Sequence, residues 1–584
     1  MALAGRYFLY REVFDRIIEK SELTALIQDL DPCKAAIVLC QISAELRLAK
    51  RDRETVGKVQ QDLAGWLLDD ATVERMKERF GTTNTADRPI FHLPQVLNVL
   101  RLVLEHASGL RDPITDQEAR YTLGAACLMM SDMYLTEEEH VALSLGTNES
   151  RMLAIMTQML GPFEITNSSA ITHVIYRARV MFRDLLSQPA VTQRISKECE
   201  GFDFEKEFSR IVGLQLSQWL FLLFAFYSYL FHYLSKEGTR CPEFLAIDHQ
   251  NFCSASSITA DAMNAGLKSI AAGFADFKEL LTQKRPTDWR FDFVPFKSKP
   301  LIELETGKSF CPDVGFLVEK MNSGVYWAIN DGLPSGGRER LKLFKAWGIL
   351  FEEYVNWFLA GYNFRQSLSF WPSPKFPDGS ESFDGAFLQD SRFMPMEYKG
   401  RFLKIEARYS GSIEAFESDL DLKIGEGCEQ LARKIMDLFT ADPRKRKRLR
   451  DIPLNHVTRV IPVLVVQDNI LRGPFVNWWL NKKFDSLIDR TQLHCEVKVD
   501  SLNLVNIHEL ETMAESAEAG SFDIFHGLQL RCHADPGMRS ALHDFLLNVP
   551  GYGEGKSNRI EKILADQWKE MEEYVFGRER ENGS

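Results

Sequence analysis

The chain has few features of a secreted or membrane-bound protein. Its ten cysteines include no C-x-x-C pair, and they do not combine with the twelve histidines at zinc-finger spacing. Scattered cysteines are typical of reduced intracellular thiols, so we expect no disulfide framework. The N-terminal segment, residues 1–20, carries charges throughout and lacks the apolar run of a signal peptide. These absences predict a cytoplasmic protein.

Long hydrophobic runs are also scarce. The best candidate, residues 214–234, is rich in aromatic side chains but is interrupted by Gln215, Gln218 and His232. Its uninterrupted apolar part, residues 219–231, is shorter than the roughly 20 residues that a membrane helix needs. We therefore expect a buried helix of a large helical domain and no membrane partner, with a membrane span as the alternative.

Positive charge is in the minority, with 70 basic against 82 acidic residues and a formal net charge of -12. A protein that coats nucleic acid needs concentrated Lys and Arg, so any contact with nucleic acid must be local. The apolar share of 45% and charged share of 26% are typical of folded proteins, and 584 residues can supply two or more domains. The motifs G-x-S-x-G, H-E-x-x-H and G-x-G-x-x-G are absent from the sequence.

The hydrophobic pattern divides the chain. Up to about residue 283, apolar residues recur every three or four positions, which predicts helices. Three prolines and alternating aromatics then mark residues 284–300, and short β-branched runs such as residues 459–467 follow, which predict buried strands. We expect a multi-domain protein with an all-α N-terminal half for sensing, regulation or assembly, followed by an α/β domain. The predicted parts are the helical domain (1–284), a connecting segment (285–341), the α/β core (342–510) and a helical C-terminal extension (511–584).

Residues 381–400 contain the candidate site. Two apolar runs around a polar turn at residues 389–391 predict a β-hairpin. Asp384 lies on its first strand, and Glu397 and Lys399, two residues apart, point to one face of its second strand. Carboxylates on adjacent strands suit Mg²⁺ or Mn²⁺, which polarises a phosphodiester and activates a bound water. Lys399 can orient that water and offset developing negative charge.

Helices are predicted on both sides of this hairpin. Upstream, residues 346–361 form an amphipathic helix that carries Glu352 and Glu353. Downstream, residues 425–439 form a second helix, followed by the strand at 459–467 and another helix from Phe475. The predicted order is helix, hairpin, helix, strand, helix.

With this order and these residues, the segment from about Trp347 to Leu510 resembles the PD-(D/E)XK nuclease superfamily, which has the restriction-endonuclease-like fold. The helix motif G-x-x-x-E of the superfamily matches residues 348–352, its metal-binding Asp matches Asp384, and its E-x-K motif matches residues 397–399. The resemblance implies that Asp384 and Glu397 hold the metal, that Glu352 helps through a second metal or a water, and that Lys399 assists the attacking water. Glu353 is an alternative to Glu352.

Many RecB-like members of the superfamily place a Q-x-x-x-Y motif on the next helix. Gln430 fits this motif and is a candidate supporting residue, whereas Lys434 occupies the Tyr position. The resemblance implies in-line hydrolysis, with DNA preferred to RNA. A nuclease joined to a large helical half also resembles bacterial antiphage defence effectors, which stay inactive until triggered. The helical half offers surface for homo-oligomers or partner proteins.

A basic segment follows the second predicted helix. Six of the seven residues from Arg444 to Arg450 are basic. The segment either contacts a phosphate backbone or forms a solvated loop between helix and strand. The candidate contacts with nucleic acid are Arg444, Lys445, Arg446, Lys447 and Arg448.

Other motifs have ordinary structural interpretations. Residues 551–557, GYGEGKS, look like a phosphate-binding loop, but Pro550 stands where the Walker A motif requires Gly, so we expect a turn between helices capped by Ser557 or Asn558. Glu496 and Lys498 repeat the E-x-K spacing, which we interpret as edge-strand charge. Three histidines in or near strands are expected to be structural: His456, His494 and His508.

The sequence therefore predicts a metal-dependent nuclease. Two alternatives stay open. One is a degenerate nuclease fold that acts as a nucleic-acid-binding or scaffolding protein, and the other is a nucleotide-dependent switch at residues 551–557.

Overall fold

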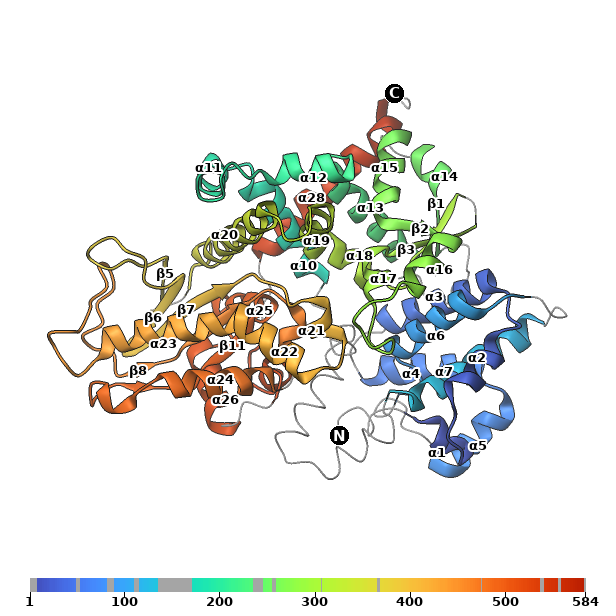
Figure 1. Cartoon of the computed structure of the whole chain (residues 1–584), viewed down its shortest axis with the longest axis horizontal. Coiled ribbons are helices and arrows are strands. Elements are labelled where there is room, and N and C mark those ends of the chain that lie inside the picture. Colours follow the sequence, from blue (N-terminus) through green and yellow to red (C-terminus); the bar gives the residue numbers. More distant parts are fainter. Residues whose placement is uncertain are drawn as a thin grey trace. The chain divides into compact units, whose positions relative to one another are not determined.

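The computed structural model describes residues 8–48, 53–80, 89–109, 115–134, 171–234, 245–254, 259–305, 307–364, 368–473, 475–535, 540–554 and 558–581 (Figure 1). The chain forms two compact units, each built from separate stretches of sequence. Unit 1 comprises Met1–Arg151, Phe208–Val325 and Trp568–Ser584, and unit 2 comprises Met152–Glu207 and Tyr326–Gln567. These discontinuous units do not coincide with the four predicted parts, 1–284, 285–341, 342–510 and 511–584.

Helices form the first part of unit 1, as the apolar periodicity predicts. Its central helix is α6 (Leu93–His106), in which residues 93–104 are all buried and Pro94 occupies the first turn. Helix α6 packs against α3 (Pro32–Leu48) and α7 (Asp116–Asp132). Among the described residues of this part, the other helices are α1 (Tyr10–Phe14), α2 (Lys20–Ile27), α4 (Arg53–Leu67) and α5 (Asp70–Phe80).

Helix α13 (Leu216–Leu234) is the predicted buried helix. Trp219, Leu223 and Phe226 are buried, and α13 packs against α15 (Ala260–Ile270) and α18 (Val314–Met321) within unit 1. Among the described residues no single helix has both the length and the apolar character to cross a bilayer. Only the pair Phe204–Val212 and Leu216–His232, bent by 65°, reaches that composition when joined.

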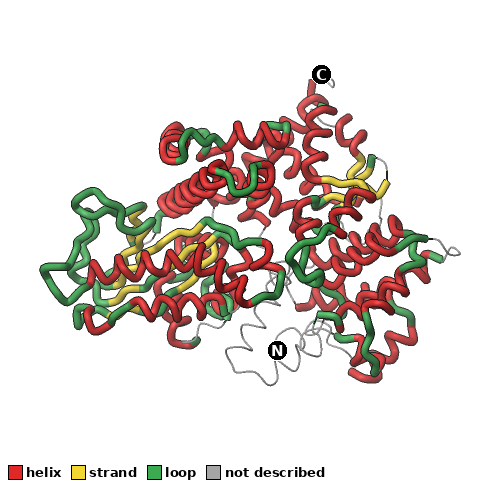
Figure 2. Tube along the Cα trace, in the orientation of Figure 1, coloured by secondary structure: helices red, strands yellow, loops and turns green. Residues whose placement is uncertain are grey.

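A small mixed sheet completes unit 1. Its strand order is β1-β4-β3-β2, in which β2 runs parallel to β3 and the other pairs are antiparallel. Strands β1 and β2 fall in the stretch predicted to be all helical, and Figure 2 shows them among the surrounding helices. Because a three-residue strand is too short to display alternation, the sequence pattern could not reveal them. The strands and remaining helices are β1 (Ala246–Asp248), β2 (Ala271–Gly273), β3 (Leu301–Glu305), β4 (Lys308–Phe310), α14 (His249–Ser254), α16 (Phe274–Thr282) and α17 (Val294–Ser298).

Residues 285–325 are therefore part of a folded unit. They supply β3 and β4 of the sheet and helices α17 and α18, where a connecting segment was predicted. The prolines at 286, 295 and 300 mark turns and a helix start within the unit, and these signals resemble those of a linker.

Unit 2 is built on a second mixed sheet. Strand β5 (Ser369–Pro372) pairs antiparallel with β6 (Gly385–Gln389), which pairs antiparallel with β7 (Arg392–Lys399). The predicted hairpin is thus confirmed, and Asp390 in its turn has a φ of 53°, which Asp tolerates better than most residues.

The predicted strand at 459–467 is present but interrupted. It forms β8 (Arg459–Val460) and β9 (Val463–Val466), both parallel to β7, with a break at Ile461 and Pro462. Proline lacks the N–H that a strand ladder requires. The outer strand is interrupted at the same level, as β10 (Lys498–Val499) and β11 (Asn503–Asn506).

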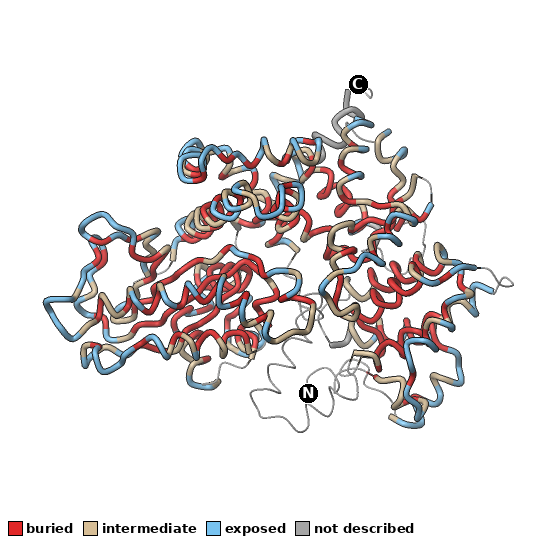
Figure 3. The backbone as a smooth tube through the Cα atoms, viewed as in Figure 1, coloured by how far each residue is buried: buried red, intermediate tan, exposed pale blue. Residues whose placement is uncertain are grey.

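Helices cover both faces of this sheet. Helices α23 (Glu426–Phe439) and α24 (Val476–Leu487) contact each other and the sheet on one face, and α20 (Arg338–Ala360) and α25 (Ile507–Glu518) contact its strands from the other. Alternation along β7 shows the two faces, since the Tyr398 hydroxyl donates to Asn356 of α20 while Lys399 reaches α23. Figure 3 shows buried residues concentrated along the strands.

The other described helices of unit 2 are α21 (Ile405–Tyr409), α22 (Ile413–Leu420), the π-helix η3 (Asp421–Gly425), η4 (Asn469–Arg472), η5 (Arg490–Gln492), α26 (Ile524–Ala534) and α27 (Leu542–Leu546).

An N-terminal stretch of helices belongs to this unit. It comprises α10 (Ile171–Arg179), the π-helix η1 (Val180–Leu185) and α11 (Pro189–Glu198), and it precedes the rest of unit 2 by more than a hundred residues. Both η1 and α11 contact α20. The fully buried Arg177 donates to both carboxylate oxygens of Glu511, at 2.9 and 2.7 Å. Periodicity predicts that these residues are helical, but it does not indicate which helices they pack against. Three helices cross the divisions between the units along the chain: α12 (Phe204–Val212), α19 (Ser323–Gly332) and α28 (Asn558–Glu581).

Candidate active site

The two central carboxylates lie close together where β6 begins and β7 ends. The register of the two strands pairs Gly385 with Met396, and Asp384, the residue before β6, donates its N–H to the same Met396 carbonyl at 3.1 Å. Asp384 is therefore beside the end of β7 that carries Glu397, near enough for the two charges to interact. The Asp384 carboxylate also accepts a bond of 2.7 Å from the backbone N–H of Tyr398.

The pKa of Asp384 reflects this crowding. Burial, followed by the charge of Glu397, raises the pKa of Asp384 to about 7. The Tyr398 N–H and the charges of Lys434 and Lys399 oppose the rise. A buried carboxylate whose pKa is raised by a neighbouring carboxylate gains stability from a cation, and the hard oxygen atoms of the two side chains fit Mg²⁺ or Mn²⁺.

Lys399 lies on the same face as Glu397, as its spacing predicts. Its Nζ donates to Oε1 of Gln430 at 2.5 Å and lies 4.0 Å from the Glu397 carboxylate. Gln430, the candidate supporting residue of the sequence, therefore contacts Lys399. Helix α23 comes close to the strands at Gly427, where a Cβ atom would lie 2.6 Å from Leu464 Cδ1 and 3.0 Å from Lys399 Cε.

Lys434 is a residue of the site that the sequence pattern alone did not assign. One helical turn beyond Gln430, its Nζ donates to Glu397 Oε2 at 2.9 Å. The Q-x-x-x-Y spacing pointed to this position, but lysine there was a departure from the motif. The structure brings Lys399 and Lys434 to the same carboxylate, one from β7 and one from α23.

Glu352 lies at the edge of the site and is held by an arginine. Arg194 of α11 donates to both of its carboxylate oxygens, at 3.0 and 3.2 Å, and to Glu353 at 2.6 Å. Ser373 links this group to the hairpin, because its hydroxyl donates to Glu352 and its N–H donates to the Asp384 carbonyl. Burial raises the pKa of Glu352, Arg194 lowers it, and the charge of Asp384 raises it further. Arg194 precedes Glu352 by 158 residues, and no local sequence signal connects them.

The predicted three-carboxylate metal set is only partly assembled. Among the residues that the structure describes, the one trio whose ligand atoms all lie within 4.8 Å of each other does not include Asp384, Glu397 or Glu352. Asp384 and Glu397 could hold a cation between them, whereas both oxygens of Glu352 already accept from Arg194. Glu352 as a metal ligand stays a prediction.

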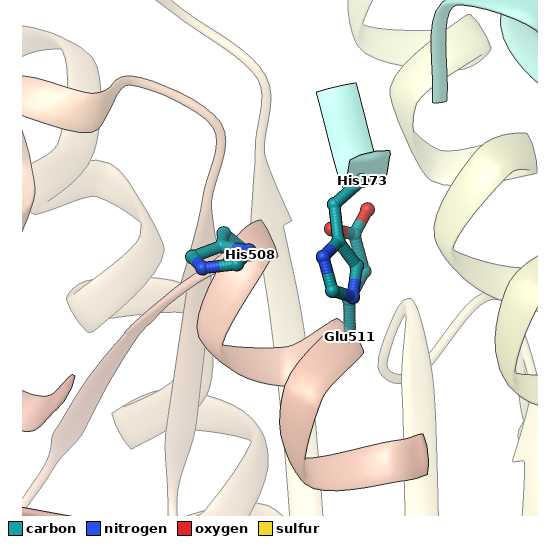
Figure 4. Close-up of side chains that lie close together, drawn as sticks. All are labelled: His173, His508 and Glu511. Carbon is teal, nitrogen blue, oxygen red and sulfur yellow. The ribbon is translucent and has the colours of Figure 1, made fainter. Parts of the chain in front are cut away.

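That one trio is His173, His508 and Glu511, shown in Figure 4. His508 and Glu511 come from α25 and His173 from α10, so His508 is not the isolated histidine that the sequence suggested. Glu511 accepts from Arg177 through both oxygens and from the Tyr354 hydroxyl at 2.6 Å. A metal ion would have to compete with these buried donors, so we interpret the trio as part of a structural network.

His456 and His494 are surface or partly exposed. His456 is exposed in the turn before β8, and His494 is half-buried between η5 and β10, where its N–H donates to the Phe439 carbonyl.

The basic segment lies beside the loop that leads into Asp384. Five of its six basic residues are exposed, and the Arg450 N–H donates to the Lys375 carbonyl at 2.9 Å. Lys375 pairs with Glu381 across the loop that precedes Asp384. Lys447 forms an ion pair with Asp437 and Arg446 donates to the Thr440 carbonyl. The predicted contacts Arg444, Lys445 and Arg448 extend from the same segment.

The second E-x-K sequence has no similar surroundings. Glu496 lies in an exposed turn and Lys498 is exposed on β10, at the end of the sheet order. Both are edge charges, as the sequence indicated.

The described part of the GYGEGKS sequence is a turn between helices. Gly551 and Gly553 have positive φ angles of 84° and 76°, and Tyr552 is buried. The next described residue, Asn558, begins α28. Residues 555–557, including Lys556 and the predicted cap Ser557, lie outside the described residues.

No family model, curated protein or solved structure matches this chain. The hairpin and α23 therefore provide the geometry from which the chemistry of the site is inferred.

Proposed function

We propose that this protein is a metal-dependent nuclease of the PD-(D/E)XK type, whose site is Asp384, Glu397 and Lys399. The observation that carries the proposal is the closeness of two carboxylates: the Asp384 side chain accepts from the Tyr398 N–H at 2.7 Å, beside Glu397 on β7, and Lys399 follows two residues further along the strand. The order of α20, hairpin, α23, β8/β9 and α24 supports it, because this order agrees with the one that the resemblance implies.

Each residue has a role that fits phosphodiester hydrolysis. Asp384 and Glu397 would bind Mg²⁺ or Mn²⁺, which when bound supplies Lewis acidity toward a phosphate oxygen and toward water. Gln430 orients the Lys399 ammonium. From this position Lys399 can hold the attacking water and stabilise the negative charge that develops on the phosphorus oxygens. Glu352 would act at the edge of the site through a water or a second cation.

The substrate is proposed to be DNA in preference to RNA, on the resemblance alone. The exposed Arg444, Lys445 and Arg448 are near the loop that ends at Asp384, where they could bind the phosphates that flank the cleaved bond. With a net charge of -12, the rest of the chain offers little attraction to a polyanion.

The test is a cleavage assay on the full chain. Purified protein with Mg²⁺ or Mn²⁺ is incubated with single- and double-stranded DNA and RNA, and Lys399→Ala is compared with the wild type. We expect cleavage that EDTA stops and that Lys399→Ala reduces at least 100-fold. Lys498→Ala, in the second E-x-K sequence, is the matched control and should cleave like the wild type. Equal activity of Lys399→Ala and the wild type would refute the site.

A degenerate nuclease fold that binds or organises nucleic acid is the second candidate. It is favoured by the ion pair between Lys434 and Glu397, which neutralises a ligand that catalysis requires. It predicts binding of nucleic acid without cleavage under any metal, and binding that Lys399→Ala leaves unchanged.

We also propose that unit 1 regulates the nuclease, as in an antiphage defence effector of the cytoplasm. Its helices offer surfaces for a homo-oligomer or a partner protein. Deletion or substitution in unit 1 should then change the trigger for cleavage and not the cleavage chemistry.

A further inference from the structure

The site contains two lysines, and only one of them belongs to the E-x-K sequence. Lys434 of α23 donates to Glu397 Oε2 at 2.9 Å, a shorter separation than the 4.0 Å between Lys399 and the same carboxylate. Lys399 is instead directed to the side-chain oxygen of Gln430. Lys434 is therefore the main ion-pair partner of Glu397.

The ammonium of Lys434 also acts on the second carboxylate. Its charge stabilises the ionised form of Asp384, against the opposing effect of the neighbouring Glu397. A divalent cation would be stabilised by the same two carboxylates through the same Coulombic attraction. The ammonium and a bound divalent cation would therefore compete for the same carboxylate oxygens, including at least one oxygen of Glu397.

The surroundings of Lys434 allow its ammonium group to move away from Glu397. Its side chain is 15% exposed, and besides its ion pair with Glu397 its Nζ lies 5.7 Å from the centroid of the Phe383 ring. A long flexible stem allows Lys to change position without moving the helix that carries it.

We propose that Lys434 is a resident counter-ion of the site, which holds Glu397 when the metal is absent and which a divalent cation must displace in order to bind. This proposal rests on the proposed function, since it takes Asp384 and Glu397 as the metal ligands. The displaced ammonium then faces the space where the substrate phosphate would bind, so Lys434 adds a second positive charge beside that of Lys399.

Metal affinity, measured in addition to cleavage, tests the role of Lys434. Mn²⁺ is titrated calorimetrically into the full chain, wild type and Lys434→Met. Because the variant removes the nearer competitor and leaves Glu397 with only the more distant Lys399, at 4.0 Å, we expect Mn²⁺ to bind about tenfold more tightly or better. Cleavage by Lys434→Met should fall, because the second positive charge is lost.

Two further variants separate an effect of the Lys434 ion pair from a general effect of net charge on metal affinity. Lys434→Arg keeps the charge and should bind Mn²⁺ like the wild type. Arg433→Met changes the net charge equally at the neighbouring, exposed position and should also bind like the wild type. Thermal unfolding of each variant identifies those that fail to fold, and if Lys434→Met fails, Lys434→Gln replaces it.

The outcomes distinguish the two proposals. If Lys434→Met binds Mn²⁺ no more tightly than the wild type, the counter-ion proposal is overturned, whether or not the wild type cleaves nucleic acid. If Lys434→Met binds Mn²⁺ more tightly while the wild type cleaves no substrate, the counter-ion proposal stands and the nuclease proposal falls.

Discussion

Arg194 determines what Glu352 is able to do. An arginine that holds both oxygens of a carboxylate competes with any metal ion for them, and here the same guanidinium also binds Glu353 and Glu198. On the proposed function, we therefore expect the intact protein to bind one divalent cation, at Asp384 and Glu397, and Glu352 to act through a water.

Removal of this arginine should create a second cation site. In Arg194→Ala, Glu352 and Glu353 lose their shared partner beside Asp384, so we expect the Mn²⁺ stoichiometry in calorimetry to rise from one to two. Arg338→Ala is the control, because Arg338 pairs with Glu200 on the surface, away from these carboxylates. An unchanged stoichiometry in Arg194→Ala would show that Glu352 is too remote to bind a cation.

His92 makes the stability of unit 1 sensitive to acid. Full burial lowers the pKa of His92 from 6.5 to about 3, and its ring accepts a hydrogen bond from the Gln95 N–H at the start of α6. The unfolded chain therefore binds more protons than the folded chain between pH 3 and 6.5. Stability is fully present above pH 6.5 and falls as the pH falls, by about 1.4 kcal/mol per pH unit.

Asparagine at this position keeps a capping side chain but does not titrate. Between pH 7 and pH 5, the free energy of unfolding of the wild type should therefore fall about 2 kcal/mol more than that of His92→Asn, as measured by urea unfolding. Parallel pH profiles for the two proteins would contradict the prediction.

Among individual residues, the sequence could predict the positions that strand alternation and motif spacing determine. Glu397 and Lys399 share a face because they are two residues apart on a strand, and Gln430 reaches Lys399 from a helix with a recognisable pattern. Arg194 could not be predicted, because the ion pair joins helices far apart in sequence. Lys434 could be located by its spacing, but its partner could not.

Helix α23 depends on a glycine where it meets the strands. In Gly427→Ala the new Cβ would lie 2.6 Å from Leu464, so either the helix or the strand must move. We expect a loss of about 1–3 kcal/mol in the free energy of unfolding, the usual range for overpacking. Cleavage should fall too, because Lys399 Cε lies 3.0 Å from the new atom.

Gly348→Ala is the matched control for this change. Gly348 lies inside α20, and a Cβ there would meet no atom within 4 Å. We expect this variant to be more stable than the wild type by roughly 0.5–1 kcal/mol, because alanine favours a helix. Equal destabilisation of both variants would contradict the packing argument.

The basic segment after α23 should contribute to substrate binding through charge. The triple variant Arg444→Gln, Lys445→Gln, Arg448→Gln removes three exposed cations and leaves Arg446 and Lys447 with their partners in the protein. We expect weaker binding to duplex DNA and a plot of log K against log salt that is shallower by about 0.9 for each lost phosphate contact. An unchanged slope would indicate a solvated loop.

Among the elements, the long and regular ones were predictable. The hairpin, α20, α23 and α24 follow from clear periodicity over many residues. Strands β1 and β2 are three residues long, and the π-helix η3 continues α22 into α23 without a sequence signal of its own. The broken strand β8/β9 was predicted as one run because Pro462 lies within an otherwise apolar stretch.

At the scale of the molecule, each unit is built from stretches that lie apart in sequence. A fragment that begins at residue 285 contains the candidate site but lacks α10, η1 and α11. Glu511 would then be left without Arg177, and one unpaired buried charge costs about 3–5 kcal/mol. Tyr176 and Phe182 would also no longer cover Phe358 and Trp347.

We expect this fragment, residues 285–584, to aggregate or to unfold without cooperativity, whereas the full chain gives a cooperative transition by circular dichroism. A monomeric fragment with a sharp transition would show that α10, η1 and α11 are not needed for the core. Domain boundaries of this kind could not be predicted from composition, because residues 284–300 contain the turn signals of a linker while they belong to a folded sheet domain.

The ion pair between Arg177 and Glu511 also limits how early the core of unit 2 can be completed during synthesis. The two residues are 334 positions apart, and a ribosome that adds about 5–20 residues per second needs roughly 20–70 seconds to pass from one to the other. During that interval the nascent chain carries Arg177 without its carboxylate partner, and the core of unit 2 stays incomplete. The proposed nuclease would therefore gain its activity only after residue 511 has been synthesised, and a chain that ends before this residue would not cleave nucleic acid.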